Sequence, residues 1–178
     1  MKTITKTYNV YKFSELSEDA KQKVLEAMYD INIDYEWWDY VYEDAENIGL
    51  KITEFDLDRA SFVHADTILS YTEIADRIIA EHGETCETYQ TAKEFLNDRD
   101  NLVAKYSDGV KLDEVTEENE YDFDQDCDNL EEEFHKSLCE DYRIMLQNEY
   151  EYLTSEECIK ESIIDDDHNY TIDGEIEY

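Results

Sequence analysis

The chain has 178 residues, of which 49 are acidic and 15 are basic, so its net charge is −34. Such a surface repels nucleic acid and anionic membranes, and it attracts proteins that carry basic clefts. The 15 tyrosines, six phenylalanines and two tryptophans recur at regular spacings, which favours a folded protein over an acidic disordered chain. The length is typical of one domain, so we expect a single acidic domain over residues 1–178.

The chain lacks the sequence signals of secretion or membrane insertion. Residues 1–13 contain no apolar run of signal-peptide length, and no segment approaches the roughly 18 apolar residues of a membrane span. The four cysteines are scattered without a C-x-x-C pair, which favours reduced thiols. We therefore expect a cytoplasmic protein that does not bind membranes.

The N-terminal third is predicted to contain a strand, two helices and a hairpin. Residues 3–13 are rich in threonine, tyrosine and valine, which favours a strand. Ser17 is a suitable N-cap for a helix that ends near residue 31, and apolar side chains at three- and four-residue steps predict a second helix over 34–48. The alternating runs LKITEFDLD and SFVHADTIL predict a central hairpin.

The rest of the chain is predicted to be mainly helical. Helices are expected over residues 72–82, capped by Thr72, over 86–107 and over 124–152. The polar stretch 111–126 is expected to be a loop or a frayed helix entrance. Thr154 and Glu157 fit a capping box for a short final helix, and Gly174 marks a C-terminal hairpin. Because strands and helices do not alternate as βαβ units, we expect an α+β fold. A small antiparallel sheet, formed by the N-terminal strand and the two hairpins, would pack with five to six helices.

Negative charge is concentrated in the last third of the chain. Residues 112–178 hold 25 acidic and three basic side chains. This segment is the most acidic helical portion of the predicted domain, and it ends in the C-terminal hairpin. It is therefore the strongest anionic surface that the sequence predicts.

Three acidic or histidine-containing clusters raise the question of a metal site. The series Asp122, Asp124, Asp126, Asp128 and Glu133 resembles an EF-hand loop, but Cys127 stands where the sharp turn requires glycine. We expect only weak cation association there. His135 and Cys139, one helical turn apart, could hold one edge of a zinc site with Cys127, but no second close pair is present. The cluster Asp165, Asp166, Asp167 and His168 is best interpreted as a solvated turn. No metal or cofactor is expected.

No motif indicates catalysis. The phosphate-binding, dinucleotide-binding, serine-hydrolase and zinc-protease patterns are all absent from the sequence. The acidic third retains only Lys136, Arg143 and Lys160 to face a phosphate group. We therefore expect a protein that is not an enzyme, with a divalent-metal-dependent enzyme as the weaker alternative.

The segment DYEWWDYVYEDAENIGLKI, residues 34–52, combines aromatic and acidic side chains. Helical spacing places Trp38, Val41 and Tyr42 on one face, with Ala45 and Ile48, and it places Trp37 and Tyr40 at the border of that face. Four carboxylates step down the opposite side, those of Glu36, Asp39, Glu43 and Glu46. The aromatic face is thus predicted to be core, and the carboxylate row to be exposed.

The segment LSEDAKQKVLEAMYDINIDYEWWDYVYEDAENIGLKI, followed by FDLDR, resembles a family of small acidic proteins of phages and mobile elements. Members are often hypothetical or labelled antitoxin-like. The resemblance covers residues 8–60, and the later segments ENEYDFDQD and EDYRIMLQNEYEYLT less closely. It implies a phage or mobile-element origin, hence the cytosol of a bacterial host, and no catalytic residues. In charge alone, the chain is similar to antirestriction and anti-CRISPR DNA mimics, which occupy the DNA-binding surfaces of defence enzymes.

We therefore expect a non-enzymatic inhibitor that mimics nucleic acid and binds a basic DNA- or RNA-binding host protein, such as a restriction or CRISPR component. Duplex DNA carries one charge per about 1.7 Å, so 34 charges correspond to about 17 base pairs. The alternative is an antitoxin-like or adaptor module that binds through an apolar groove. Oligomeric state is left open, and a homodimer is compatible with the sequence. The predicted partner-binding acids are Glu36, Asp39, Glu43, Glu46, Asp113, Glu114, Glu117, Glu118, Glu120, Asp122, Asp124, Asp126, Asp128, Glu132 and Glu133.

Overall fold

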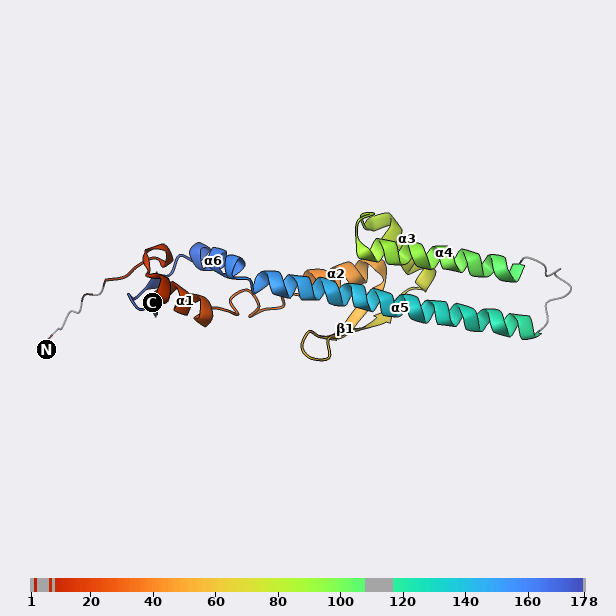
Figure 1. The fold of residues 1–178 in the computed structure, drawn as a ribbon, viewed down its shortest axis with the longest axis horizontal. Coiled ribbons are helices and arrows are strands. Elements are labelled where there is room, and N and C mark those ends of the chain that lie inside the picture. Colours follow the sequence, from red (N-terminus) through yellow and green to blue (C-terminus); the bar gives the residue numbers. More distant parts are fainter. Residues whose placement is uncertain (1, 3–6, 8, 108–116, 178) are drawn as a thin grey trace. The chain divides into compact units, whose positions relative to one another are not determined.

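The computed structural model describes residues 2, 7, 9–107 and 117–177, and it confirms the α+β class (Figure 1). The described residues form six α-helices and two separate two-stranded antiparallel sheets, where the sequence predicts one small sheet. The chain divides into two compact units, where the sequence predicts one domain. Unit 1 joins Met1–Trp37 with Asn148–Tyr178, and unit 2 is Trp38–Gln147. Two units form because each buries an apolar core of its own.

Unit 1 is built from the two ends of the chain. Tyr11 and Tyr170 exchange two backbone hydrogen bonds, of 2.9 and 2.8 Å. Residues 3–6 and 8 of the predicted opening strand lie outside the described residues, and its described part contributes only this bridge at Tyr11. The elements of unit 1 are η1 (Phe13–Glu15), α1 (Glu18–Ala27), α6 (Glu156–Asp165), β3 (Asn169–Tyr170) and β4 (Ile176–Glu177). Its core consists of Phe13, Leu16, Ala20, Val24, Leu25, Ile159, Ile163 and Tyr170.

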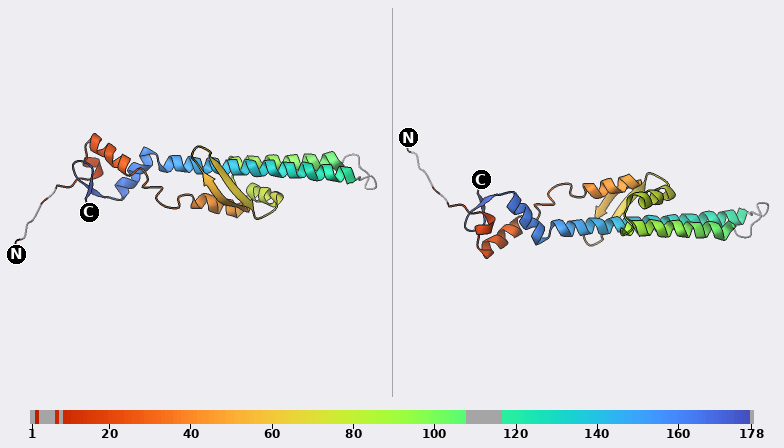
Figure 2. Two further views of the ribbon diagram at one scale, coloured as in Figure 1. Left: turned by 90° about the horizontal axis from the view of Figure 1, so that it is seen from below. Right: turned by 90° about the horizontal axis from the view of Figure 1, so that it is seen from above.

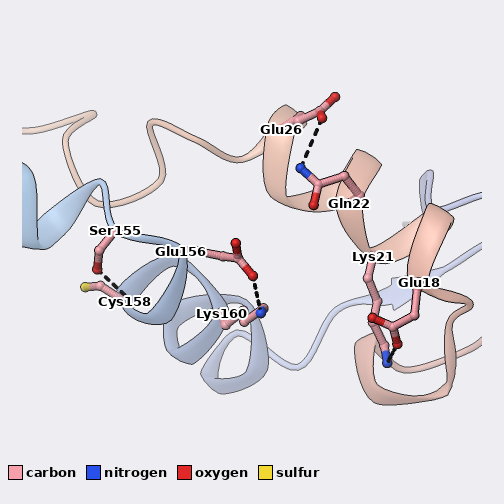
Figure 3. Close-up of polar contacts among 8 residues, drawn as sticks. All are labelled: Glu18, Lys21, Gln22, Glu26, Ser155, Glu156, Cys158 and Lys160. Atoms are coloured by element: carbon pink, nitrogen blue, oxygen red, sulfur yellow. Dashed lines mark hydrogen bonds and ion pairs between the residues drawn. The ribbon is translucent and has the colours of Figure 1, made fainter.

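The helices of unit 1 are capped and paired locally. The hydroxyl of Ser17 accepts from the backbone N–H of Ala20, as predicted, at 3.3 Å. The cap of α6 is Ser155 and not the predicted Thr154, because the Thr154 hydroxyl donates instead to the Tyr150 carbonyl. Figure 3 shows ion pairs within single helices, Lys21 with Glu18 on α1 and Lys160 with Glu156 on α6.

Unit 2 contains the central hairpin and the helices that cover it. Its elements are α2 (Asp39–Ile48), β1 (Leu50–Asp56), β2 (Phe62–Thr67), α3 (Tyr71–Glu81), α4 (Glu87–Ser107) and the part of α5 (Glu117–Leu153) that ends at Gln147. The hairpin pairs Leu50 with Thr67 and Asp56 with Phe62. The N-cap of α3 is Ser70, two residues before the predicted cap Thr72, and Ser70 forms a capping box with Glu73. Gly49 ends α2 with a φ of 94°, a conformation that glycine adopts at little cost.

Helix α2 begins at Asp39, five residues later than predicted. The two tryptophans that precede it belong to different units. Trp37 is buried and lies against Tyr150 in unit 1, with ring centroids 5.8 Å apart, whereas Trp38 meets Phe55 of unit 2 edge-on. The prediction that Trp37 lies at the border of the α2 core face was therefore wrong. Periodicity along one helix could not reveal that these neighbours pack in different units.

Helices α4 and α5 run side by side in unit 2 (Figure 2). Phe95 and Phe134 stack with ring centroids 4.1 Å apart, and Tyr106 meets Phe123 edge-on at 5.3 Å. Helix α5 begins at Glu117, so the segment 111–126, predicted to be a loop or a frayed helix entrance, is helical from that residue onward. Among the described helices, none combines the length and the apolar character needed to cross a membrane.

Candidate functional site

The first part of α5 is rich in acidic residues and contains no basic residue. Ten acidic residues and no basic residue lie between Glu117 and Glu133. At 1.5 Å per residue this segment is about 24 Å long, which is one carboxylate per about 2.4 Å. Duplex DNA carries one charge per about 1.7 Å, and each of its strands one per about 3.4 Å. The helix therefore has a charge density between those of a single strand and a duplex.

The helix sorts these acids onto two faces. Residues two apart on an α-helix lie about 200° apart around the axis, whereas residues four apart share a face. Asp124, Asp128 and Glu132 therefore form an outer stripe, and all three are exposed. Asp122, Asp126 and Glu133 form an inner stripe beside α4. The aspartates that alternate in the sequence thus point in different directions, and they cannot converge on a calcium ion as EF-hand ligands do.

Two of these acids are neutralised by neighbouring cations. The Asp126 carboxylate accepts hydrogen bonds from Lys105 Nζ and the Tyr106 hydroxyl, each at 2.9 Å. These bonds, Lys105 first, lower the pKa of Asp126. Glu132 pairs with Lys136 at 2.5 Å, which likewise lowers its pKa. For Asp124 and Asp128, the other acids of the outer stripe, no ion pair with a cation is recorded among the described residues.

The remaining predicted acids lie elsewhere. On α2, Asp39, Glu43 and Glu46 are exposed, as predicted. Glu36 is also exposed but precedes the helix and belongs to unit 1, so the predicted row of four is a row of three on α2. Asp113 and Glu114 lie outside the described residues. The side chains of Glu117, Glu118 and Glu120 are not described, although their backbone is part of α5.

The acids of α2 and those of α5 lie on different helices of unit 2. Helix α2 meets α5 where the Tyr142 hydroxyl donates to the Asp44 carboxylate at 2.8 Å. Tyr142 is 14 residues beyond Asp128, which corresponds to about 21 Å along the helix. The two predicted groups of acids are therefore separate features of unit 2, and the longer series is on α5.

A partly buried polar network in unit 2 has no signal in the sequence. His82 Nδ1 lies 2.7 Å from the Thr88 hydroxyl, and its Nε2 lies 3.5 Å from the Asp44 carboxylate that also binds Tyr142. The order of hydroxyl, imidazole and carboxylate is that of a nucleophile with its base. Thr88 is only 3 % exposed, however, so a substrate does not reach its hydroxyl. The network instead joins α2, α4 and α5, and burial raises the pKa of Tyr142.

A cavity of about 400 Å³ lies between β2 and α5 and includes the predicted pair of His135 and Cys139. Cys139 Sγ is 3.6 Å from His135 Nε2, but Cys127 is twelve residues from Cys139, about 18 Å along the helix. Within the described residues, no group of three or more His, Cys, Asp or Glu side chains could hold a metal ion. Burial raises the pKa of Cys139, which disfavours a reactive thiolate.

The acidic cluster before β3 forms a turn at Asp166 and Asp167, as predicted, whereas Asp165 is the last residue of α6 and His168 is half-buried. Asp165, Asp166 and Asp167 are all exposed. Asp167 has a φ of 51° and pairs with Lys12 at 3.0 Å, while Asp166 lies 3.8 Å from His168. These contacts close the turn within unit 1.

Comparisons with protein-family models, curated proteins and solved structures found no match to this chain. The resemblance of residues 8–60 to acidic phage proteins therefore stays a prediction.

Proposed function

We propose that this protein is a non-enzymatic inhibitor that occupies the nucleic-acid-binding surface of a basic protein in a bacterial cytosol. The observation that carries the proposal is the series of ten acidic residues without a basic residue between Glu117 and Glu133. Its density of negative charge is close to that of nucleic acid. A restriction or CRISPR component is a suitable target, because such proteins hold DNA in basic clefts.

The way α5 is held supports this function. Stacking of Phe95 on Phe134 and the edge-on contact of Tyr106 with Phe123 fix the acidic part of α5 against α4. The outer-stripe carboxylates therefore occupy defined positions, so that less conformational entropy is lost when a partner binds. The partner's basic cleft releases its bound anions when it takes up these carboxylates. The affinity of the complex therefore depends steeply on salt concentration.

The test compares two stripes of the same spacing and charge. One variant carries Asp124→Asn, Asp128→Asn and Glu132→Gln on α5. The matched control carries Glu157→Gln, Glu161→Gln and Asp165→Asn on α6, which are also exposed and four residues apart. Each variant removes three negative charges, so an effect of net charge alone would be equal in both.

Each protein is used to capture partners from a nuclease-treated bacterial lysate over a series of salt concentrations. We expect the unmodified chain to recover a nucleic-acid-binding protein, to compete with duplex DNA for it, and to lose about 10³-fold in affinity between 50 and 200 mM salt for about six paired charges. The α5 variant should bind more weakly than the α6 control. Recovery of no nucleic-acid-binding protein, or a partner whose binding is independent of salt, would overturn the proposal.

A further inference from the structure

A groove runs between α4 and α5 on the side of the inner stripe. It consists of two adjoining hollows, of about 200 and 360 Å³, which share Asp98, Leu130 and Glu133. On α4 the lining residues extend from Thr91 to Lys105, which is about 21 Å at 1.5 Å per residue. The groove is therefore about four helical turns long, and both walls belong to unit 2.

The floor of the larger hollow is apolar, whereas the smaller hollow is mainly polar and is also lined by Thr91 and Ser137. Phe95 and Phe134, the stacked pair, are buried beneath one hollow, and Leu102 and Leu130 line the other. Both leucines are only half-buried. Water therefore retains access to apolar surface in the groove, and a partner that covers it would gain hydrophobic stabilisation.

The rim of the groove is acidic. Glu94 and Asp98 stand on the α4 side and Glu133 on the α5 side, and all three are exposed. Lys105 is the one cation among the residues that line the two described hollows, and it is paired with Asp126 at 2.9 Å. A partner must therefore combine apolar side chains for the floor with positive charges for the edges.

We propose that this groove binds a basic amphipathic α-helix of the partner protein. Such a helix presents apolar side chains at steps of three and four residues, and lysine or arginine on both sides of that ridge. A groove of four turns matches the length of an ordinary helix. Nucleic acid and a second copy of this chain fit less well, because each would bring negative charge to a negative rim.

This inference rests on the proposed function and specifies which part of the partner is bound. The outer stripe can attract any basic surface, whereas the groove selects one with a helical apolar ridge. The outer stripe and the groove would then act on opposite sides of α5. The charge of the outer stripe would speed association with the partner, and the shape of the groove would slow its dissociation.

The experiment uses the full chain and two synthetic peptides of about 16 residues, long enough for four helical turns. Both contain only leucine and lysine in equal proportion. In one, leucine recurs every three or four residues, and in the other the same residues are scrambled so that no apolar ridge forms. Affinities are measured by fluorescence anisotropy at moderate salt. We expect the amphipathic peptide to bind at least tenfold more tightly than the scrambled one.

Variants of the floor and rim locate the binding. Leu102→Asn and Leu130→Asn should each weaken binding of the amphipathic peptide roughly tenfold. Val103→Asn is the control, since Val103 is 42 % exposed on α4 and does not line the groove. Because a half-buried leucine also contributes to folding, a second variant changes only the exposed rim, Glu94→Gln with Asp98→Asn. It should weaken peptide binding more than Glu157→Gln with Glu161→Gln, which removes the same charge from α6.

Equal binding of the two peptides, or unchanged binding in the floor and rim variants, would overturn the groove proposal and leave the salt-dependent capture by the outer stripe intact. A dimer of this chain in sedimentation experiments that is lost on Leu102→Asn would also overturn it, because the occupant would then be a second copy. Conversely, selective binding of the amphipathic peptide without capture of any nucleic-acid-binding protein would refute the proposed function alone.

Discussion

Units 1 and 2 carry similar densities of net charge but arrange that charge differently. Unit 1 holds 18 acidic and six basic residues and unit 2 holds 31 and nine, so each has one net negative charge per five to six residues. In unit 1, Lys21 and Lys160 each pair with a glutamate of the same helix. In unit 2, ten acids follow one another on α5 without a basic residue.

This difference shows that net charge does not locate a binding surface. The acids of both units contribute to the charge of −34. Only those on α5 form a dense series on a helix that aromatic contacts hold in place. The proposed function therefore depends on an arrangement specific to unit 2, and experiments that treat the units separately can test it.

The largest effect on stability is expected from removing one buried aromatic side chain from either unit. Tyr142 in unit 2 and Tyr170 in unit 1 are both fully buried. Replacing either with alanine removes an aromatic side chain and should lower the free energy of unfolding by about 3–5 kcal/mol. In hydrogen-exchange measurements, Tyr142→Ala should reduce protection chiefly in α2–α4, and Tyr170→Ala chiefly in α1 and α6. An equal loss across both units in either variant would show that the cores are not separate.

A smaller effect is expected from the buried hydroxyl of Tyr142, which should make unit 2 sensitive to alkali. Burial, with the nearby Asp44 carboxylate, raises the pKa of Tyr142. Above the ordinary tyrosine pKa of about 10, the unfolded chain releases this proton while the folded chain keeps it, so the free energy of unfolding falls as the pH rises. Tyr142→Phe should cost about 1–3 kcal/mol at neutral pH, because Asp44 loses a hydrogen bond, and should flatten the alkaline decline in urea denaturation. Tyr29→Phe, at an exposed position of unit 1, is the control, and an equal flattening there would contradict the prediction.

A somewhat smaller loss of stability is expected from a substitution in the C-terminal turn of unit 1. Gly174 has a φ of 88°, and a Cβ atom at this position would lie 2.8 Å from the Ala20 carbonyl oxygen. Gly174→Ala should therefore lower the free energy of unfolding by about 1–2 kcal/mol in thermal or denaturant melts. Gly83→Ala is the control, because its Cβ would meet only Cys86 Sγ at 4.0 Å. If both substitutions have the same effect, the backbone of Gly174 is not constrained as described.

The smallest effect concerns the neutralised acid of the inner stripe. Lys105 and Tyr106 hold the pKa of Asp126 below its ordinary value of 3.8. Lys105→Gln should raise the pKa of Asp126 toward that value, as measured by NMR titration of its carboxyl carbon, and Tyr106→Phe should raise it less. Lys93→Gln, an exposed lysine on the same helix, should leave it unchanged. An unchanged pKa in the Lys105 variant would mean that Asp126 contributes a free charge to the acidic series.

Much of the secondary structure could be predicted because its signals are local. The hairpin over 50–69, the helix α4 and the hydroxyl cap of α1 follow from alternation, helical spacing and capping chemistry within a few residues. Errors occurred where two residues compete for one role. Ser155 takes the cap predicted for Thr154, because the Thr154 hydroxyl bonds to a carbonyl one turn earlier.

The candidate site was predicted as a set of acids but not as an arrangement. The sequence identified Asp122, Asp124 and Asp126 as neighbours, whereas the helix places them on two faces, and Lys105 pairs with one of them. The groove depends on which α4 residues lie opposite Leu130 and Glu133. No spacing in the sequence encodes that register, because it is set by the contacts between two helices joined by residues 108–116.

The sequence by itself determined that this protein is strongly acidic, that it combines helices with short antiparallel strands, and that ten acidic residues and no basic residue lie between Glu117 and Glu133. These properties depend on composition and on interactions between residues close in the chain. The tertiary structure alone decided that Trp37 and Trp38 belong to different units, that the two ends of the chain form one unit, and that a groove with an apolar hollow accompanies the acidic helix. Those features arise from contacts between residues far apart in the sequence, which hydrophobic burial selects and local patterns do not record.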